Sequence, residues 1–124
     1  MQKGVKVLQR ISIVLLVALI SLAGCSSAKS TDDLIGDLSS LEEGDRVKAV
    51  RLLQHRNGDA TKVVPALTES LADPQADIRL SAAIGLGYFG ADAQSAIKAL
   101  ENAQNDRDAR VRNAARVAIS RIRG

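Results

Sequence analysis

Hydrophobic residues in the second half of the chain recur at the spacing of amphipathic helices. On a helical wheel of about 100° per residue, the apolar side chains of 75–89 gather on one narrow face, and those of 108–123 do the same. The two faces consist of Ile78, Ala82, Leu86 and Phe89, and of Val111, Ala115, Ile119 and Ile122. The whole pattern predicts helices near 31–40, 44–56, 61–72, 75–89, 92–104 and 108–123.

Local signals predict where several of these helices begin and end. Thr31 suits the N-cap of the first helix, and Asn57-Gly58 predicts a left-handed stop for the second. Pro65 is expected in the first turn of its helix, where a missing N–H costs least. Gly90 is expected to close the fourth helix, and Asp108 to cap the last one.

The chain also repeats itself with a period of 33 residues. Equivalent positions hold Leu34, Leu67 and Leu100, and likewise Ala49, Ala82 and Ala115. A helix pair that recurs at a fixed period is the signature of an α-solenoid. We therefore predict an all-α fold, a short α-solenoid of three helix-pair repeats at about 31–57, 59–90 and 92–123. Arg116 follows Val50 and Ala83 in one apolar column, which indicates a polar cap on the last repeat.

The second repeat carries a motif order that can be compared with known repeats. It runs Val64-Pro65-Ala66-Leu67 in the first helix, Asp73-Pro74 at the turn, then Ile78-Arg79 with Ala82, Ala83 and Leu86. This order resembles the HEAT-like repeats of phycobilin lyases, over roughly residues 31 to 123. The resemblance implies a helical repeat protein. It leaves two roles open, a protein-binding scaffold and an accessory, lyase-like enzyme subunit.

The first 25 residues have the features of a secretory signal peptide. Three basic residues precede an apolar run that is short for a transmembrane helix. These are Lys3, Lys6 and Arg10, followed by Ile11 to Leu22.

The segment then ends in Leu22-Ala23-Gly24-Cys25, which resembles the lipobox of bacterial lipoproteins. That resemblance implies removal of residues 1–24, acylation of Cys25 and a small polar tether over 25–30. An ordinary signal peptide, or a signal anchor, with an incidental cysteine is the alternative. The resemblance to Gram-negative lipoproteins also implies a location, because Ser26 in place of Asp after the cysteine favours the outer over the inner membrane. We expect the protein to face the periplasm.

Charge is distributed unevenly along the chain. The net charge of +3 comes from the three basic residues of the signal segment, so the rest is about neutral. A neutral domain has no general attraction for nucleic acid. The first repeat is acidic (Asp32, Asp33, Asp37, Glu42, Glu43, Asp45) and the last is basic (Arg107, Arg110, Arg112, Arg116, Arg121, Arg123). These are either two solvated ends or surfaces for self-association.

A stripe opposite the core face of the second helices is the candidate binding site. Leu80, Ile84 and Tyr88 lie at i, i+4 and i+8, and Val117 is the equivalent of Ile84 in the third repeat. In HEAT-like arrays the second helices line the concave surface, so we expect a partner-binding groove with Arg51 and Arg121 at its rim. The alternatives are burial of the stripe by helix rotation, or ordinary apolar surface.

Arginines also recur in register at positions 46, 79 and 112. They predict either a ladder for an anionic ligand or structural pairing with turn acids such as Asp73 and Asp106. His55 is the only histidine, so the chain has no paired His-Glu metal motif. We expect no metal, no cofactor and no catalysis. The prediction is an envelope-anchored lipoprotein that binds a protein partner.

Overall fold

The structure is a computed structural model that describes residues 27–124. The predicted signal peptide and the predicted lipidation site at Cys25 lie outside the described residues. Within 27–124 all regular structure is helical. The helices are α2 (Thr31–Asp37), α3 (Glu43–Leu53), η1 (Asn57–Asp59), α4 (Ala60–Ser70), α5 (Ala76–Phe89), η2 (Gly90–Ala96), α6 (Ile97–Ala103) and α7 (Ala109–Arg123), where η denotes a 3₁₀-helix.

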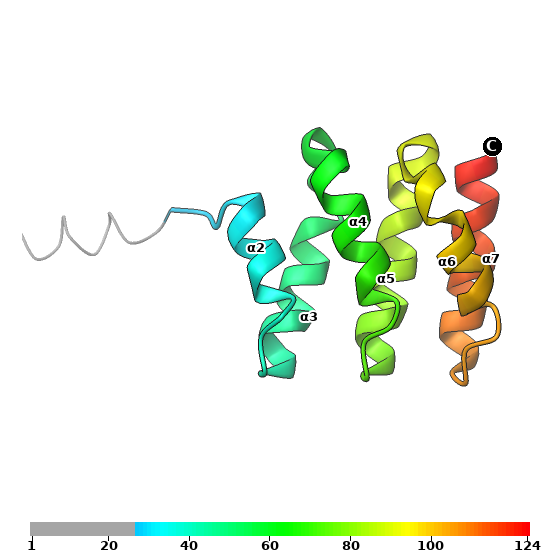
Figure 1. The fold of residues 1–124 in the computed structure, drawn as a ribbon, viewed down its shortest axis with the longest axis horizontal. Coiled ribbons are helices and arrows are strands. Elements are labelled where there is room, and N and C mark those ends of the chain that lie inside the picture. The colour runs from blue at the N-terminus through cyan, green and yellow to red at the C-terminus, as the bar shows by residue number, and fades with distance from the viewer. Residues whose placement is uncertain (1–26) are drawn as a thin grey trace, which may run out of the picture.

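The α-helices stack side by side as three hairpins (Figure 1), which pair α2 with α3, α4 with α5 and α6 with α7. The first helices, α2, α4 and α6, form one layer. The second helices, α3, α5 and α7, form the other. This arrangement confirms the predicted all-α solenoid of three helix pairs.

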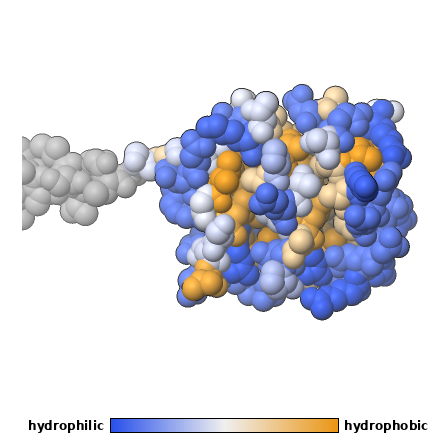
Figure 2. Space-filling model, viewed as in Figure 1, coloured by the Kyte–Doolittle hydropathy of each residue, from blue (hydrophilic) through white to orange (hydrophobic). Residues whose placement is uncertain are grey.

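The core lies between the two layers and is aliphatic. Leu34, Leu67 and Leu100, one from each first helix, are fully buried at equivalent places. The predicted apolar faces of the second helices are confirmed, because all their side chains are buried. Figure 2 shows the face formed by the first helices, where hydrophilic residues surround narrow hydrophobic strips. The 33-residue period of the sequence is therefore the period of the core.

The N-cap of α2 is Ser30 rather than the predicted Thr31. The Ser30 side chain accepts a hydrogen bond from the Asp33 backbone N–H at 3.1 Å, and Asp33 in turn accepts from the Ser30 backbone N–H at 3.2 Å. This reciprocal capping box satisfies two N–H groups that the helix cannot pair itself. Thr31 is freed for another contact, and its buried hydroxyl donates to Asp59 of the second repeat.

The predicted left-handed stop at Asn57-Gly58 is wrong. Among the described glycines only Gly90 and Gly124 have positive φ, and residues 57–59 form the short helix η1, which leads into α4. Because α4 begins at Ala60, Pro65 falls in its second turn, just past the first turn or so in which it was expected. Gly90 does close α5, with φ of 53°, and Asp108 does cap α7 by accepting from the Arg110 N–H.

The predicted helix over 92–104 is only partly α-helical. Its first half is the 3₁₀-helix η2, and α6 begins at Ile97. A 3₁₀-helix has three residues per turn, so residues three apart point the same way. Ala93, whose φ of −96° and ψ of 19° leave the helical range, and Ala96 are both fully buried.

Two arginines join neighbouring repeats through a turn carboxylate. Arg79 Nε and Nη2 donate to Asp106 Oδ2 and Oδ1 at 2.8 and 3.0 Å. Arg46 makes the same contacts with Asp73, at 3.0 and 3.5 Å. The Nη1 atom of each donates to carbonyl oxygens of the turn in its own repeat. These contacts confirm the structural interpretation for the first two arginines of the ladder.

Candidate binding groove between α5 and α7

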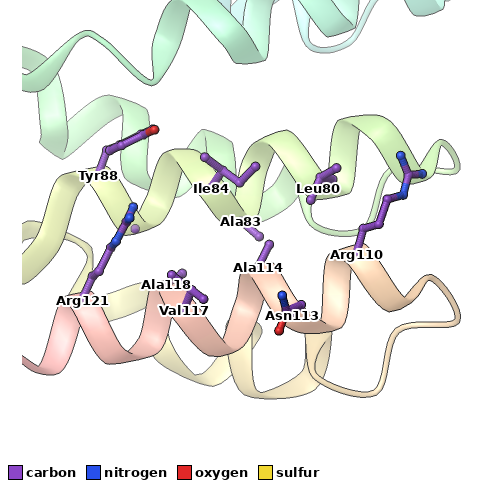
Figure 3. A pocket seen from close by; sticks show the side chains of 11 residues that line it. Leu80, Ala83, Ile84, Tyr88, Arg110, Asn113, Ala114, Val117, Ala118 and Arg121 are labelled. Atoms are coloured by element: carbon purple, nitrogen blue, oxygen red, sulfur yellow. The ribbon is translucent and has the colours of Figure 1, made fainter.

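A hollow open to solvent lies between α5 and α7 and has a volume of about 370 Å³. Leu80, Ile84 and Tyr88 follow one another along α5, and Val117 and Arg121 face them from α7 (Figure 3). We call this hollow the groove. Its full lining is Leu80, Ala83, Ile84, Gly87, Tyr88, Arg110, Asn113, Ala114, Val117, Ala118 and Arg121.

Small residues form the floor of the groove because the two helices approach closely there. Gly87 lies directly against Ala118, and a Cβ atom on Gly87 would be 3.2 Å from the Ala118 Cα atom. One turn earlier, Ala83 and Ala114 point toward each other (Figure 3). A larger side chain at any of these positions would push the helices apart or fill the hollow.

Apolar side chains form the walls and remain accessible to water. Ile84 is 37% exposed, Val117 45% and Tyr88 56%. They are three of only five large hydrophobic residues that the structure exposes within 27–124. Three such side chains around one hollow form a surface that can be covered by a partner.

The two ends of the groove differ in their electrostatics. At one end, Arg110 bonds to Asp108 at 2.8 Å and to Asp77 at 3.0 Å. The Arg110 hydrogen bond, together with a backbone N–H, lowers the pKa of Asp108 to about 2, and both carboxylates raise the pKa of Arg110. The charge of Arg110 is therefore balanced by its neighbours.

At the other end, Arg121 lies over the Tyr88 ring, with its Cζ atom 5.5 Å from the ring centroid (Figure 3). Such a cation–π contact holds the guanidinium in place without neutralising it. No carboxylate within the described part of the chain pairs with Arg121. This end of the groove presents a positive charge beside an apolar wall.

Five of the six residues predicted for the groove line it: Leu80, Ile84, Tyr88, Val117 and Arg121. Arg51 does not, because it lies on α3 and the groove runs between α5 and α7. Sequence reasoning missed Arg110 and the small floor residues. The signal for the floor was present, since glycine and alanine occupy the facing positions of both helices.

The lining of the groove is mostly apolar, and its polar side chains are those of Tyr88, Arg110, Asn113 and Arg121. It contains no carboxylate, histidine, cysteine, serine or threonine. Over residues 27–124 no cluster of metal-binding side chains is found. In the same range, no helix has the length and apolar character to span a membrane.

In a comparison with known families, a family model described as HEAT repeats matches residues 31–120. A comparison with curated proteins gives no match.

Proposed function

This chain belongs to the HEAT-repeat family, and we propose that it is a membrane-anchored bacterial lipoprotein whose repeats bind a protein partner without catalysis. HEAT repeats commonly mediate protein interactions and typically serve as scaffolds. The proposed binding site is the groove between α5 and α7. The observation that carries the proposal is the group of Ile84, Tyr88 and Val117, exposed around one hollow.

Covering these side chains would supply a useful part of a binding energy. Complete burial of an apolar side chain contributes about 1.5–3 kcal/mol, so covering the exposed parts of these three contributes on the order of 3 kcal/mol. Central apolar contacts of this kind dominate most protein interfaces. Because the floor is built from backbone-close glycine and alanine, the groove is pre-formed and needs little ordering on binding.

The charges of the groove support a partner of a particular chemistry. The partner segment carries an apolar side chain that enters the hollow. Next to that side chain it carries a carboxylate that reaches Arg121. The Arg110 end does not attract a carboxylate, because Asp77 and Asp108 already flank that guanidinium. The partner segment therefore binds in one direction, with its acidic end at Tyr88.

Substitution of Ile84 tests the groove directly. Co-purification of proteins with the tagged full chain is compared with that of Ile84→Asp and of Asn102→Asp, a matched added charge on the exposed face of α6. We expect Ile84→Asp to remove the partner and Asn102→Asp to retain it, with circular dichroism showing both variants folded. Retention of the partner by a folded Ile84→Asp would exclude the groove as its site.

The proposed anchor rests on the sequence of residues 1–25, with its basic start, apolar run and Leu22-Ala23-Gly24-Cys25 end. Acyl chains on Cys25 would hold the solenoid at the membrane, since each buried methylene contributes about 0.8 kcal/mol. We expect the full chain to fractionate with membranes and to incorporate labelled palmitate, and Cys25→Ser to lose both properties. A membrane-bound Cys25→Ser chain without label would indicate an uncleaved signal anchor instead.

A further inference from the structure

The third arginine of the ladder lacks the carboxylate that its two counterparts bind. Arg112 Nη1 donates to the carbonyl oxygens of Asp106 and Arg107, at 2.8 and 3.2 Å, as the equivalent atoms do in Arg46 and Arg79. Its Nε and Nη2 atoms, however, have no partner within residues 27–124. In Arg46 and Arg79 the same atoms bind the turn aspartate of the next repeat. We call each such arginine–aspartate pair between neighbouring repeats a rung. Arg112 therefore holds its own turn as the other two arginines do, and its Nε and Nη2 atoms remain available to a carboxylate.

The surface around Arg112 is basic. Arg116 is exposed on the same side of α7, at the position where Ala83 faces the following repeat. Arg107 lies in the same turn, but its side chain points toward the preceding repeat, where it donates to the Pro74 carbonyl oxygen at 3.3 Å. We call this surface the basic end. It attracts a partner with a complementary acidic surface.

The opposite end of the solenoid has that acidic surface. Glu42, Glu43 and Asp45 are exposed there and form no ion pair with any residue of 27–124. Leu41, in the same loop, is 99% exposed and is unusually accessible for a leucine. We call this surface the acidic end. A lone exposed leucine beside three unpaired carboxylates is a surface that a partner can cover.

In two copies stacked with the register of the repeats, the basic end of one copy would face the acidic end of the other. The position equivalent to Asp73 and Asp106 in the first repeat is Ser40, and the Asp45 carboxylate lies 3.4 Å from the Ser40 hydroxyl. If a second copy continued the stack, Arg112 would meet Ser40 with Asp45 beside it. The missing rung would then be completed by a carboxylate of the second copy.

One pair of packing positions is compatible with stacking, whereas Arg116 and Lys48, the equivalents of Ala83 and Ala114, would bring two like charges together. Leu52, half-exposed on the acidic end, is equivalent to Gly85 and Ala118, which face the preceding repeat. Ser120, on the basic end, is equivalent to Gly87. Stacking would set Leu52 against Ser120, a large residue against a small one, much as Gly85 packs against Gln54.

We propose that the chain self-associates head to tail, with Arg112 of one copy bound to Asp45 and its neighbouring glutamates in the acidic end of the next. The interface is heterologous, so it leaves one free end on each side and builds open chains rather than closed dimers. It does not involve the groove. Because the carboxylates of the acidic end are exposed, and attraction between surface charges is screened by salt, the association is weak and sensitive to salt.

Cysteine cross-linking of the full chain tests this geometry. The contact of Arg107 with Pro74 in the described chain corresponds, between copies, to Arg107 with Leu41. The variants are therefore Leu41→Cys, Arg107→Cys and the double variant, treated with a short bifunctional maleimide. The natural chain, whose one cysteine is Cys25, gives the background level of cross-linking. We expect a ladder of oligomers from the double variant, background from each single variant, and dimers alone when the two single variants are mixed.

Charge variants on the double-cysteine background test the contacts. Arg112→Gln should lower the dimer yield about fivefold, which is about 1 kcal/mol at 1.4 kcal/mol per tenfold. Because Arg112 also caps its own turn, Glu42→Lys with Glu43→Lys provides a second test at exposed sites and should lower the yield at least as much. Lys48→Ala should raise the dimer yield, because stacking would bring the positive charge of Lys48 near that of Arg116. Ile84→Asp in the groove should leave the ladder unchanged.

The proposal is overturned by a double variant that gives no ladder above background. It is equally overturned if either single variant cross-links to itself, because a head-to-tail interface cannot bring two identical sites together. A ladder that persists in both the Arg112 and the Glu42/Glu43 variants would also overturn it, since the charges would then have no part in the contact.

Discussion

Replacement of Asp106 by asparagine should remove a large part of the stability that couples the second repeat to the third. Asp106 accepts two hydrogen bonds from Arg79, at 2.8 and 3.0 Å, and a third from the Asp108 backbone N–H at 2.8 Å. The side chains of Arg79 and Asp106 are only 7% and 10% exposed. Asparagine has the same shape, but its NH₂ group would face the guanidinium donors. One hydrogen bond is lost, and Arg79 keeps its charge without a counter-ion.

The structure sets the size of the effect. A hydrogen bond to a charged group contributes about 1.5–3 kcal/mol, and removal of one partner from a fully buried ion pair costs about 3–5 kcal/mol. This pair retains some contact with water, so we expect a loss of about 2–3 kcal/mol. For a domain of this size, each kcal/mol corresponds to about 4–8 °C, which predicts a fall in Tm of about 10–20 °C.

Urea and thermal unfolding of residues 27–124, followed by far-ultraviolet circular dichroism, measure this loss. Asp73→Asn is the matched control, because Arg46 is 14% exposed and its second contact is 3.5 Å long. We expect it to cost about 1 kcal/mol. If Asp106→Asn cost no more than Asp73→Asn, the inference that burial and bidentate geometry decide the strength of a rung would be refuted.

Three further predictions concern other contacts. Gly87→Val should lower the free energy of unfolding by about 1–3 kcal/mol, because the valine side chain would meet the Ala118 backbone. Gly44→Ala, at a position with open space around it, should raise it by about 0.5 kcal/mol. Chemical denaturation measures both changes. Ser30→Ala should cost about 1 kcal/mol by loss of the capping box, and an unchanged urea midpoint would contradict that role. The hydrogen bond from Arg79 lowers the pKa of Asp106, so its stabilisation is present above the ordinary carboxyl pKa of about 4 and lost as pH falls through the lower folded value. The stability difference between the natural chain and Asp106→Asn should therefore shrink on acidification, and a constant difference would contradict the pairing.

Sequence periodicity was sufficient for the architecture but not for several local details. Leucine and alanine recur at the core positions, so helix pairing and the stacking direction follow from the 33-residue period. The winding of residues 90–96 does not follow, because a 3₁₀-helix and an α-helix both tolerate the same alanine-rich stretch. Whether Asn57-Gly58 turns left-handed likewise depends on the packing of α4 against its neighbours, which the dipeptide does not encode.

The groove could be predicted in part, because exposed apolar residues at equivalent helix positions mark a shared surface. Periodicity alone, however, does not distinguish the interface between α3 and α5 from the interface between α5 and α7, and for this reason Arg51 was expected at the rim. In the structure the two interfaces differ because the side chains at equivalent positions differ in size. Gln54 stands between α3 and α5, whereas its equivalent Gly87 lets α5 and α7 approach closely. Arg112 shows the same limit, since the missing rung is visible only when the two complete rungs are seen beside it.

The central claim, that the groove binds a protein partner, is tested most directly by photo-crosslinking in living cells. A photoreactive amino acid is placed at Tyr88 in the groove and, as a control, at Lys98, which is exposed on α6 outside it. We expect one dominant protein adduct at Tyr88 that is absent at Lys98 and is lost when Ile84→Asp is added. Equal adducts at both positions, or none at Tyr88, would contradict the claim that this groove is a docking site.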